Sequence, residues 1–130
     1  MEAKGNAKEA VRKLVIALLA VNSYPIEKVF SCSPKLEEEG VFAPEKVSSW
    51  TEEDAVRRLA RAGYNRGPFI TTLLADRLLS VSRFLQEGGL SAFQRACETR
   101  RVEEVAGALK GVRGVGPAVL RNFAILMEWE

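Results

Sequence analysis

The residues of this sequence best suited to chemistry lie near its C-terminus, in the run GVRGVGP at positions 111–117, which we call the glycine turn. It separates two helix-like stretches, residues 102–110 and 118–129. Glycine permits tight turns and the close approach of another molecule, and proline suits the first position of a helix. The first amides of that helix lack acceptors within it, and the helix dipole favours an anion beside them. The glycine turn therefore predicts an anion site with three basic neighbours: Lys110, Arg113 and Arg121.

The core of the glycine turn resembles the helix-hairpin-helix motif of DNA-binding proteins, whose hairpin reads glycine, hydrophobic residue, glycine. Gly114, Val115 and Gly116 match that core. In the motif, backbone amides hold a DNA phosphate, often beside a monovalent cation, so the resemblance allows such a cation here and implies no other cofactor. The alternative is a helix corner whose glycines serve packing only. The DNA-binding residues that we predict in this segment are Lys110, Arg113, Gly114, Val115, Gly116, Ala118, Val119 and Arg121.

A second segment, Tyr64-Asn65-Arg66, lies between two amphipathic stretches about fifty residues before the glycine turn. It resembles a loop of the endonuclease III family, the base-excision DNA glycosylases of the helix-hairpin-helix superfamily, in which this loop lies beside the lesion pocket and touches DNA. The order of elements over residues 11–127 also resembles the six-helix domain of that family. The resemblance implies that Tyr64, Asn65 and Arg66 form a second DNA contact. Two roles stay open for Tyr64: it stacks on or wedges beside a base, or it closes a corner between helices.

The residues that carry catalysis in this family are missing from their expected positions. Bifunctional glycosylases place a lysine two residues after the second hairpin glycine, where this sequence has Ala118. Monofunctional relatives need an aspartate some twenty residues past the hairpin, farther than this sequence extends. Histidine, the commonest general base, is absent. We therefore predict a DNA-binding protein without catalytic residues and expect Asp76 to be a surface charge. The alternative is a minimal DNA glycosylase or abasic-site lyase, acting alone or completed by a partner subunit.

The composition indicates a single globular domain over residues 1–130, with 47% hydrophobic and 28% charged residues. The N-terminus lacks a signal-peptide pattern, and no apolar run is long enough for a membrane span, so we expect a cytoplasmic, DNA-associated protein. Cys32 and Cys97 lack the spacing of metal ligands. They are expected to be two buried thiols or, alternatively, a disulfide.

The charge is unevenly distributed along the chain. Residues 1–53 carry seven Lys/Arg against nine Asp/Glu, whereas residues 54–121 carry twelve against six. Eleven of those twelve basic residues are arginine, which binds phosphate through a bidentate fork. This distribution predicts binding to duplex DNA that is largely independent of sequence and strongly dependent on salt. The alternative is a solvated helical surface.

The spacing of apolar residues predicts an all-α fold: a compact bundle of about six to seven helices that ends in a helix-hairpin-helix at residues 102–129. We expect residues 7–21, capped by Asn6, to form the central helix, because residues 16–21 are apolar on every side. Capping boxes are predicted at Thr51 with Asp54 and at Ser91 with Gln94. The other predicted elements are a helix over 25–31, short turns near 34–39 and 44–48, and helices over 51–62, 68–86, 91–98, 102–110 and 118–129.

The same spacing predicts which side chains face inward. In the helix over 51–62 these are Val56, Leu59 and Ala60. In the long helix they are Phe69, Leu73, Leu74, Leu78, Val81 and Leu85. The last helix is apolar over more than one face, which predicts contact with a second copy or with a partner subunit. The alternative is that residues 1–10 or 32–50 fold over it.

Overall fold

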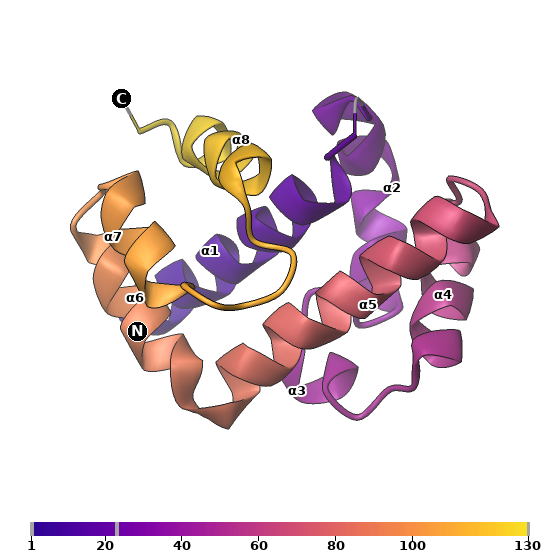
Figure 1. The fold of residues 1–130 in the computed structure, drawn as a ribbon, viewed down its shortest axis with the longest axis horizontal. Coiled ribbons are helices and arrows are strands. Elements are labelled where there is room, and N and C mark those ends of the chain that lie inside the picture. Colours follow the sequence, from indigo (N-terminus) through magenta and orange to yellow (C-terminus); the bar gives the residue numbers. More distant parts are fainter. Residues whose placement is uncertain (1, 23, 130) are drawn as a thin grey trace.

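The fold is all-helical, as the sequence predicts. The computed structural model describes residues 2–22 and 24–129, with side chains described from Ala7 onward, and these ranges contain no strand. Figure 1 shows α1 running through the middle of the molecule, with the other helices arranged around it. The helices are α1 (Glu2–Leu19), α2 (Ile26–Glu38), α3 (Pro44–Val47), α4 (Glu52–Arg61), α5 (Pro68–Phe84), the π-helical turn η1 (Leu85–Gly89), α6 (Leu90–Glu98), α7 (Val102–Ala108) and α8 (Pro117–Met127). Within the described ranges, no helix has the length and apolar character needed to cross a membrane.

Helix α1 is the central helix, which confirms the prediction from its apolar pattern. The side chains of residues 14–19 are almost completely buried, and the helix packs against α2, α5, α6 and α8. Burying one such apolar side chain stabilises the fold by about 1.5–3 kcal/mol, so α1 contributes a large part of the core. The predicted start is wrong, because α1 begins at Glu2 and Asn6 lies inside it.

Helix α2 runs through Pro34, although the sequence predicts a break after residue 31 and a separate turn. A proline in a helix interior removes a hydrogen bond and costs about 3 kcal/mol. The buried residues Val29, Ser33 and Leu36 lie on both sides of the proline, and their packing keeps the two halves in one helix. The turn predicted near 44–48 is present as α3.

Helix α4 begins at the predicted capping box. The Asp54 amide donates to Thr51 Oγ1, and the Thr51 amide donates to the Asp54 carboxylate, each at 3.1 Å. The bond from the Thr51 amide to the carboxylate is the main cause that lowers the pKa of Asp54, and the Thr51 side chain adds to it. The predicted inward face is partly wrong: Leu59 is buried, but Ala55 takes the second inward position and Ala60 is exposed.

Helix α5 begins at Pro68 as predicted, but the side chain that its first turn directs to the core is not the predicted one. Leu74, Leu78, Val81 and Leu85 are buried, whereas Leu73 is only half-buried. Phe69 is 77% exposed, which corrects the prediction that it faces the core. Thr71 takes the inward position in this turn, where its hydroxyl accepts a hydrogen bond of 2.8 Å from the Arg66 amide.

After Phe84 the helix widens into η1, where Gly88 adopts a φ of +116° and redirects the chain into α6. Helix α6 begins at Leu90 after the N-cap residue Gly89, so Ser91 lies inside it. The capping box predicted at Ser91 and Gln94 is therefore wrong. The bend lets α6 pack against α7 beside the end of α5.

Helix α8 is better covered than its sequence predicts. Val119 and Phe123 are buried, and Trp129 packs edge-on against Phe123 with ring centroids 5.5 Å apart. The helix lies against α1, and the Asn122 side chain donates to the Ala17 carbonyl at 3.3 Å. Ile125, 58% exposed, is the one large apolar side chain of α8 that reaches solvent to this extent. Helix α1 therefore covers one face of α8, and contact of the last helix with a second copy or a partner subunit stays a prediction.

Candidate nucleic-acid interface

The glycine turn joins α7 to α8 and reverses the chain through two residues with positive φ. Gly111 has a φ of +85° and Gly114 a φ of +95°, a region that side-chain-bearing residues rarely adopt. The Val112 amide donates to the Leu109 carbonyl at 3.0 Å, and the Val115 amide donates to the Val112 carbonyl at 3.3 Å. The Val115 amide is therefore used inside the turn, which corrects the prediction that it contacts a phosphate.

Two glycines of the turn serve different purposes. Gly114 lies against the stem of Arg77 on α5: a Cβ at this position would come within 2.7 Å of the Arg77 Cβ and Cγ atoms. Gly116 has an ordinary φ of −109°, and a Cβ there would meet no described atom within 4 Å. Packing explains Gly114 but not Gly116. The space at Gly116 is open to a ligand.

The start of α8 offers free backbone donors beside this space. No side chain caps the helix, and Pro117, its first residue, has no N–H. Helix geometry leaves the amides of Ala118 and Val119 without an acceptor inside α8, and the dipole makes this end partly positive. Leu120 is the first residue of this helix start whose amide is engaged: it donates to the Gly116 carbonyl at 3.0 Å. Ala118 is exposed, so its amide lies where an anion can approach.

An open hollow of about 330 Å³ lies in front of these amides. One wall is the turn and the start of α8, and the other is formed by Arg77 and by Val21 and Asn22, which follow α1. None of the described residues that line it is acidic. The Arg77 Nε atom is buried and has no hydrogen-bond partner in the described part of the molecule. The residues lining the hollow are Val21, Asn22, Arg77, Gly114, Val115, Gly116, Pro117, Ala118 and Val119.

Arg77 is the site residue that the sequence does not reveal. It lies 37 positions before Gly114 in the chain, at a polar position of a long helix, and no local motif links the two residues. Their proximity follows from the packing of the glycine turn against the middle of α5. Figure 1 shows the turn, the connection between α7 and α8, beside α5. A guanidinium in this position provides charge and directed donors for a phosphate.

The three predicted basic neighbours of the turn are exposed, and one of them is engaged in an ion pair. Lys110 and Arg121 are exposed, and neither forms an ion pair with another described side chain. Arg113 is 70% exposed, and its Nη1 lies 2.8 Å from Asp76 Oδ2. Asp76 thus holds Arg113 beside α5 and lies outside the lining of the hollow. An exposed ion pair of this kind contributes little to stability. It engages only Nη1 of Arg113, so the other guanidinium donors can meet a phosphate while the pair with Asp76 is kept.

Tyr64 is not part of this surface, which corrects the prediction of a DNA contact. Its side chain is completely buried, and its hydroxyl donates to the Leu19 carbonyl at the end of α1. Burial raises its pKa to about 12. The ring also packs edge-on against Tyr24, with centroids 5.3 Å apart. Of the two roles considered for Tyr64, the structure supports closure of a helix corner.

Arg66 also turns inward, so the second predicted contact is mostly structural. Its Nη1 donates to the Val21 carbonyl at 2.7 Å and its Nη2 to the Asn22 carbonyl at 2.9 Å. The guanidinium lies over the Tyr24 ring, 4.4 Å from its centroid. Arg66 thereby fixes Val21 and Asn22, which follow α1 and line the hollow. Asn22 adopts a φ of +62°.

Asn65 remains exposed, but its side chain also stabilises the loop. Its Oδ1 accepts a hydrogen bond of 3.0 Å from the Gly67 amide, which completes the turn into α5. Asn65 is therefore the exposed member of the predicted second contact, whereas Tyr64 is buried and Arg66 half-buried.

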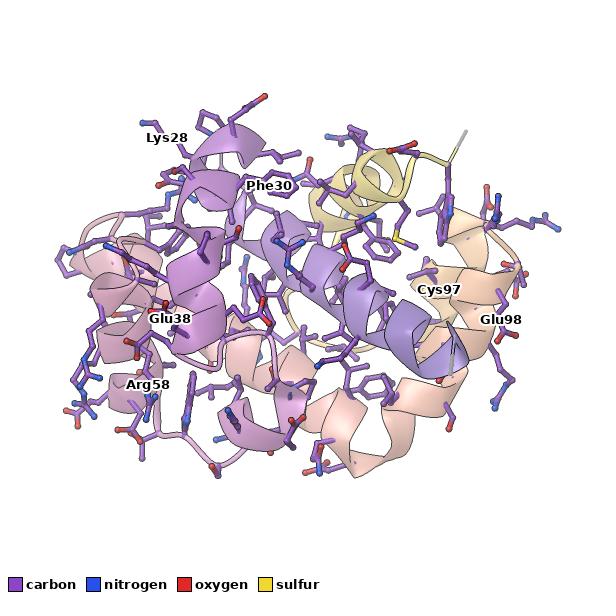
Figure 2. The ribbon with its side chains drawn as sticks, turned by 180° about the vertical axis from the view of Figure 1, so that it is seen from behind. Lys28, Phe30, Glu38, Arg58, Cys97 and Glu98 are labelled. Atoms are coloured by element: carbon purple, nitrogen blue, oxygen red, sulfur yellow. The ribbon has the colours of Figure 1, made fainter. Side chains whose placement is uncertain are left out.

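The remaining nucleophiles and metal ligands do not gather near the hollow. Cys32 and Cys97 are unbonded, so the disulfide alternative is wrong, and burial raises the pKa of the Cys97 thiol to about 12. Cys97 lies on α6 beside Glu98 (Figure 2). The described residues hold no group of three or more His, Cys, Asp or Glu side chains suited to a metal ion.

Comparison with protein-family models, curated proteins and solved structures gives no match for this chain. The function must consequently be inferred from the glycine turn and its surroundings.

Proposed function

We propose that the chain is a non-catalytic DNA-binding protein, related to the helix-hairpin-helix base-excision glycosylases, that holds a backbone phosphate of DNA in the hollow beside its glycine turn. Such a role would place it in the cytoplasm, with the DNA. The observation that carries the proposal is the combination in one open hollow of the uncapped start of α8 and the side chain of Arg77, with no acidic residue among the described residues of the lining.

The physical chemistry of this hollow fits phosphate. Backbone amides at a helix start and a fork of guanidinium donors both direct N–H groups at oxygen atoms, and both favour negative charge. The absence of a side chain at Gly116, which no internal contact requires, leaves room for a sugar–phosphate backbone to approach the amides. Lys110, Arg113 and Arg121 add long-range attraction around the hollow.

Binding of this kind contacts the backbone rather than base edges, so it depends little on sequence and strongly on salt. Each phosphate contact releases counterions, and the logarithm of the affinity falls with the logarithm of salt concentration with a slope of about −0.9 per contact. The resemblance also allows a monovalent cation at the turn, but no step of the proposal depends on it.

Fluorescence anisotropy with a labelled duplex across a salt series tests the proposal. Gly116→Leu should weaken binding at least tenfold, because the side chain fills the approach to the amides, while the midpoint of thermal unfolding stays unchanged. Gly107→Leu is the matched control: this glycine of α7 is also open and lacks positive φ, and its substitution should leave binding intact. Duplex affinity that is undetectable at low salt, or that ignores salt, would overturn the proposal.

A second variant separates charge from packing. Arg77→Met keeps the aliphatic stem against Gly114 and removes the guanidinium. We expect a roughly fivefold loss of affinity and a salt slope reduced by about one contact. Unchanged affinity and slope would remove Arg77 from the site.

Catalysis is not part of the proposal, because the position that carries the family's lysine is Ala118 and none of the described residues that line the hollow is a lysine. A Schiff base needs such an amine as nucleophile. Borohydride trapping on abasic duplex, run beside the binding series, distinguishes the enzyme alternative: a covalent product would establish a lyase instead.

A further inference from the structure

The most exposed large apolar side chain of the described residues is Phe69, on the first turn of α5. We propose that Phe69 stacks on an unpaired base of the DNA whose phosphate is held at the glycine turn, so that the protein prefers duplexes interrupted by a gap or ending in a single strand. This inference rests on the proposed function and specifies the DNA structure that the site takes.

Phe69 lies on the same row of α5 as the contact with the glycine turn. Residues seven apart in a helix share a face, so Phe69 and Asp76 are aligned, with Leu73 between them. Asp76 is the residue that pairs with Arg113 of the turn. At a rise of 1.5 Å per residue, Phe69 is about 11 Å along α5 from Asp76. Figure 1 shows the turn beside the middle of α5 and the start of α5 farther along the same helix.

The stretch of α5 between the two points carries no charged side chain. Residues 62–75 contain one charged residue, Arg66, which is basic. The carboxylate of Asp76 is neutralised by Arg113. A strand whose phosphate occupies the hollow can therefore continue along α5 toward Phe69 without passing an unpaired acid of that helix.

An exposed phenyl ring favours an unpaired base over a base stacked inside a duplex. Aromatic side chains bind single-stranded nucleic acid by stacking on base faces, and they do so with little sequence preference. In an intact duplex both faces of each base are already covered by neighbours, and exposing one requires unstacking. An unpaired base next to a held phosphate offers a free face, so the ring gains contact area without that cost.

Anisotropy on three DNAs of equal length tests the inference: an intact duplex, the same duplex with a short gap containing 2-aminopurine, and the single strand. We expect the gapped DNA to bind at least tenfold more tightly than the intact duplex and to show quenched 2-aminopurine fluorescence. Phe69→Ala should remove most of that preference and the quenching, while duplex affinity changes less than twofold. Phe69→Trp should restore both.

Phe30→Ala is the matched control, because Phe30 is an exposed phenylalanine on α2, labelled in the view from behind in Figure 2. It should leave all three affinities unchanged. Duplex binding that responds to salt and to Gly116→Leu, but shows neither a preference for the gap nor a Phe69 effect, would overturn the inference and leave the proposed function standing. No binding to any of the three DNAs would overturn both.

Discussion

Two helices of this protein begin with the same dipeptide and have opposite surroundings. Gly67-Pro68 starts α5 and Gly116-Pro117 starts α8, and in both cases glycine is the N-cap residue, proline the first helical residue, and no side chain caps the helix. The local chemistry of both starts is that of an anion site. The residues around them decide which of the two is available.

At the start of α5 the preceding side chains are committed to the interior. Tyr64 bonds to the Leu19 carbonyl at the end of α1, and Arg66 bonds to carbonyls of the two residues 21 and 22 that follow this helix. At the start of α8 the basic residues next to it in the chain are exposed, and Arg77, from a distant helix, lines the hollow. A glycine-rich helix start therefore indicates a binding site only when its polar neighbours are not committed to the interior. Three sets of variants test this difference.

The largest effect should come from the glycines with positive φ. Gly114→Ala combines an unfavourable backbone conformation with a contact of 2.7 Å to Arg77 Cβ, so we expect a loss of about 2–4 kcal/mol in the free energy of unfolding. Gly67→Ala has a φ of +91° but open space, so about 1–2 kcal/mol is expected. Urea unfolding monitored by circular dichroism measures both. Equal losses would show that the turn does not pack on Arg77.

Replacing one arginine from each region should affect stability in one case and DNA affinity in the other. Arg66→Ala removes two charge-assisted hydrogen bonds to the segment that follows α1 and should lower the free energy of unfolding by about 2 kcal/mol. Arg113→Ala breaks only an exposed ion pair, so stability should change by less than about 0.5 kcal/mol. Duplex affinity should show the reverse order, with a roughly threefold loss for Arg113→Ala. A destabilised Arg113 variant with full affinity would contradict the assignment.

The smallest effect concerns Tyr64 and alkaline pH. Because burial raises its pKa to about 12, from an ordinary value of 10.0, the hydroxyl stays neutral in the folded state after it ionises in the unfolded chain. Its contribution to stability is complete below pH 10 and is lost as the pH rises toward 12. Tyr64→Phe should cost about 1 kcal/mol at pH 7 and should flatten the fall in stability above pH 10.

Unfolding curves between pH 8 and 12 measure this difference. Cys97→Ala provides the comparison, since burial also raises the pKa of that thiol to about 12 and its contribution begins to fall near pH 9. If Tyr64→Phe retained the full alkaline loss above pH 10, the buried hydroxyl would not be its source.

The sequence alone determined the features that depend on neighbours in the chain. Helical periodicity predicts an all-α fold and the buried character of α1, because both follow from which residues recur every three to four positions. Thr51 and Asp54 specify their cap because the two groups lie within one turn. The glycine turn and Pro117 likewise specify where α8 begins.

Only the tertiary structure decided the direction of side chains whose partners are distant. Whether Tyr64 meets DNA or the Leu19 carbonyl, and whether Phe69 or Thr71 faces the core, depends on how α5 lies against α1. The same holds for Arg77, which enters the hollow because the turn packs on the middle of α5. Periodicity defines a stripe on each helix, but the burial of a given residue and its hydrogen-bond partners are set by packing between helices, which no local pattern encodes.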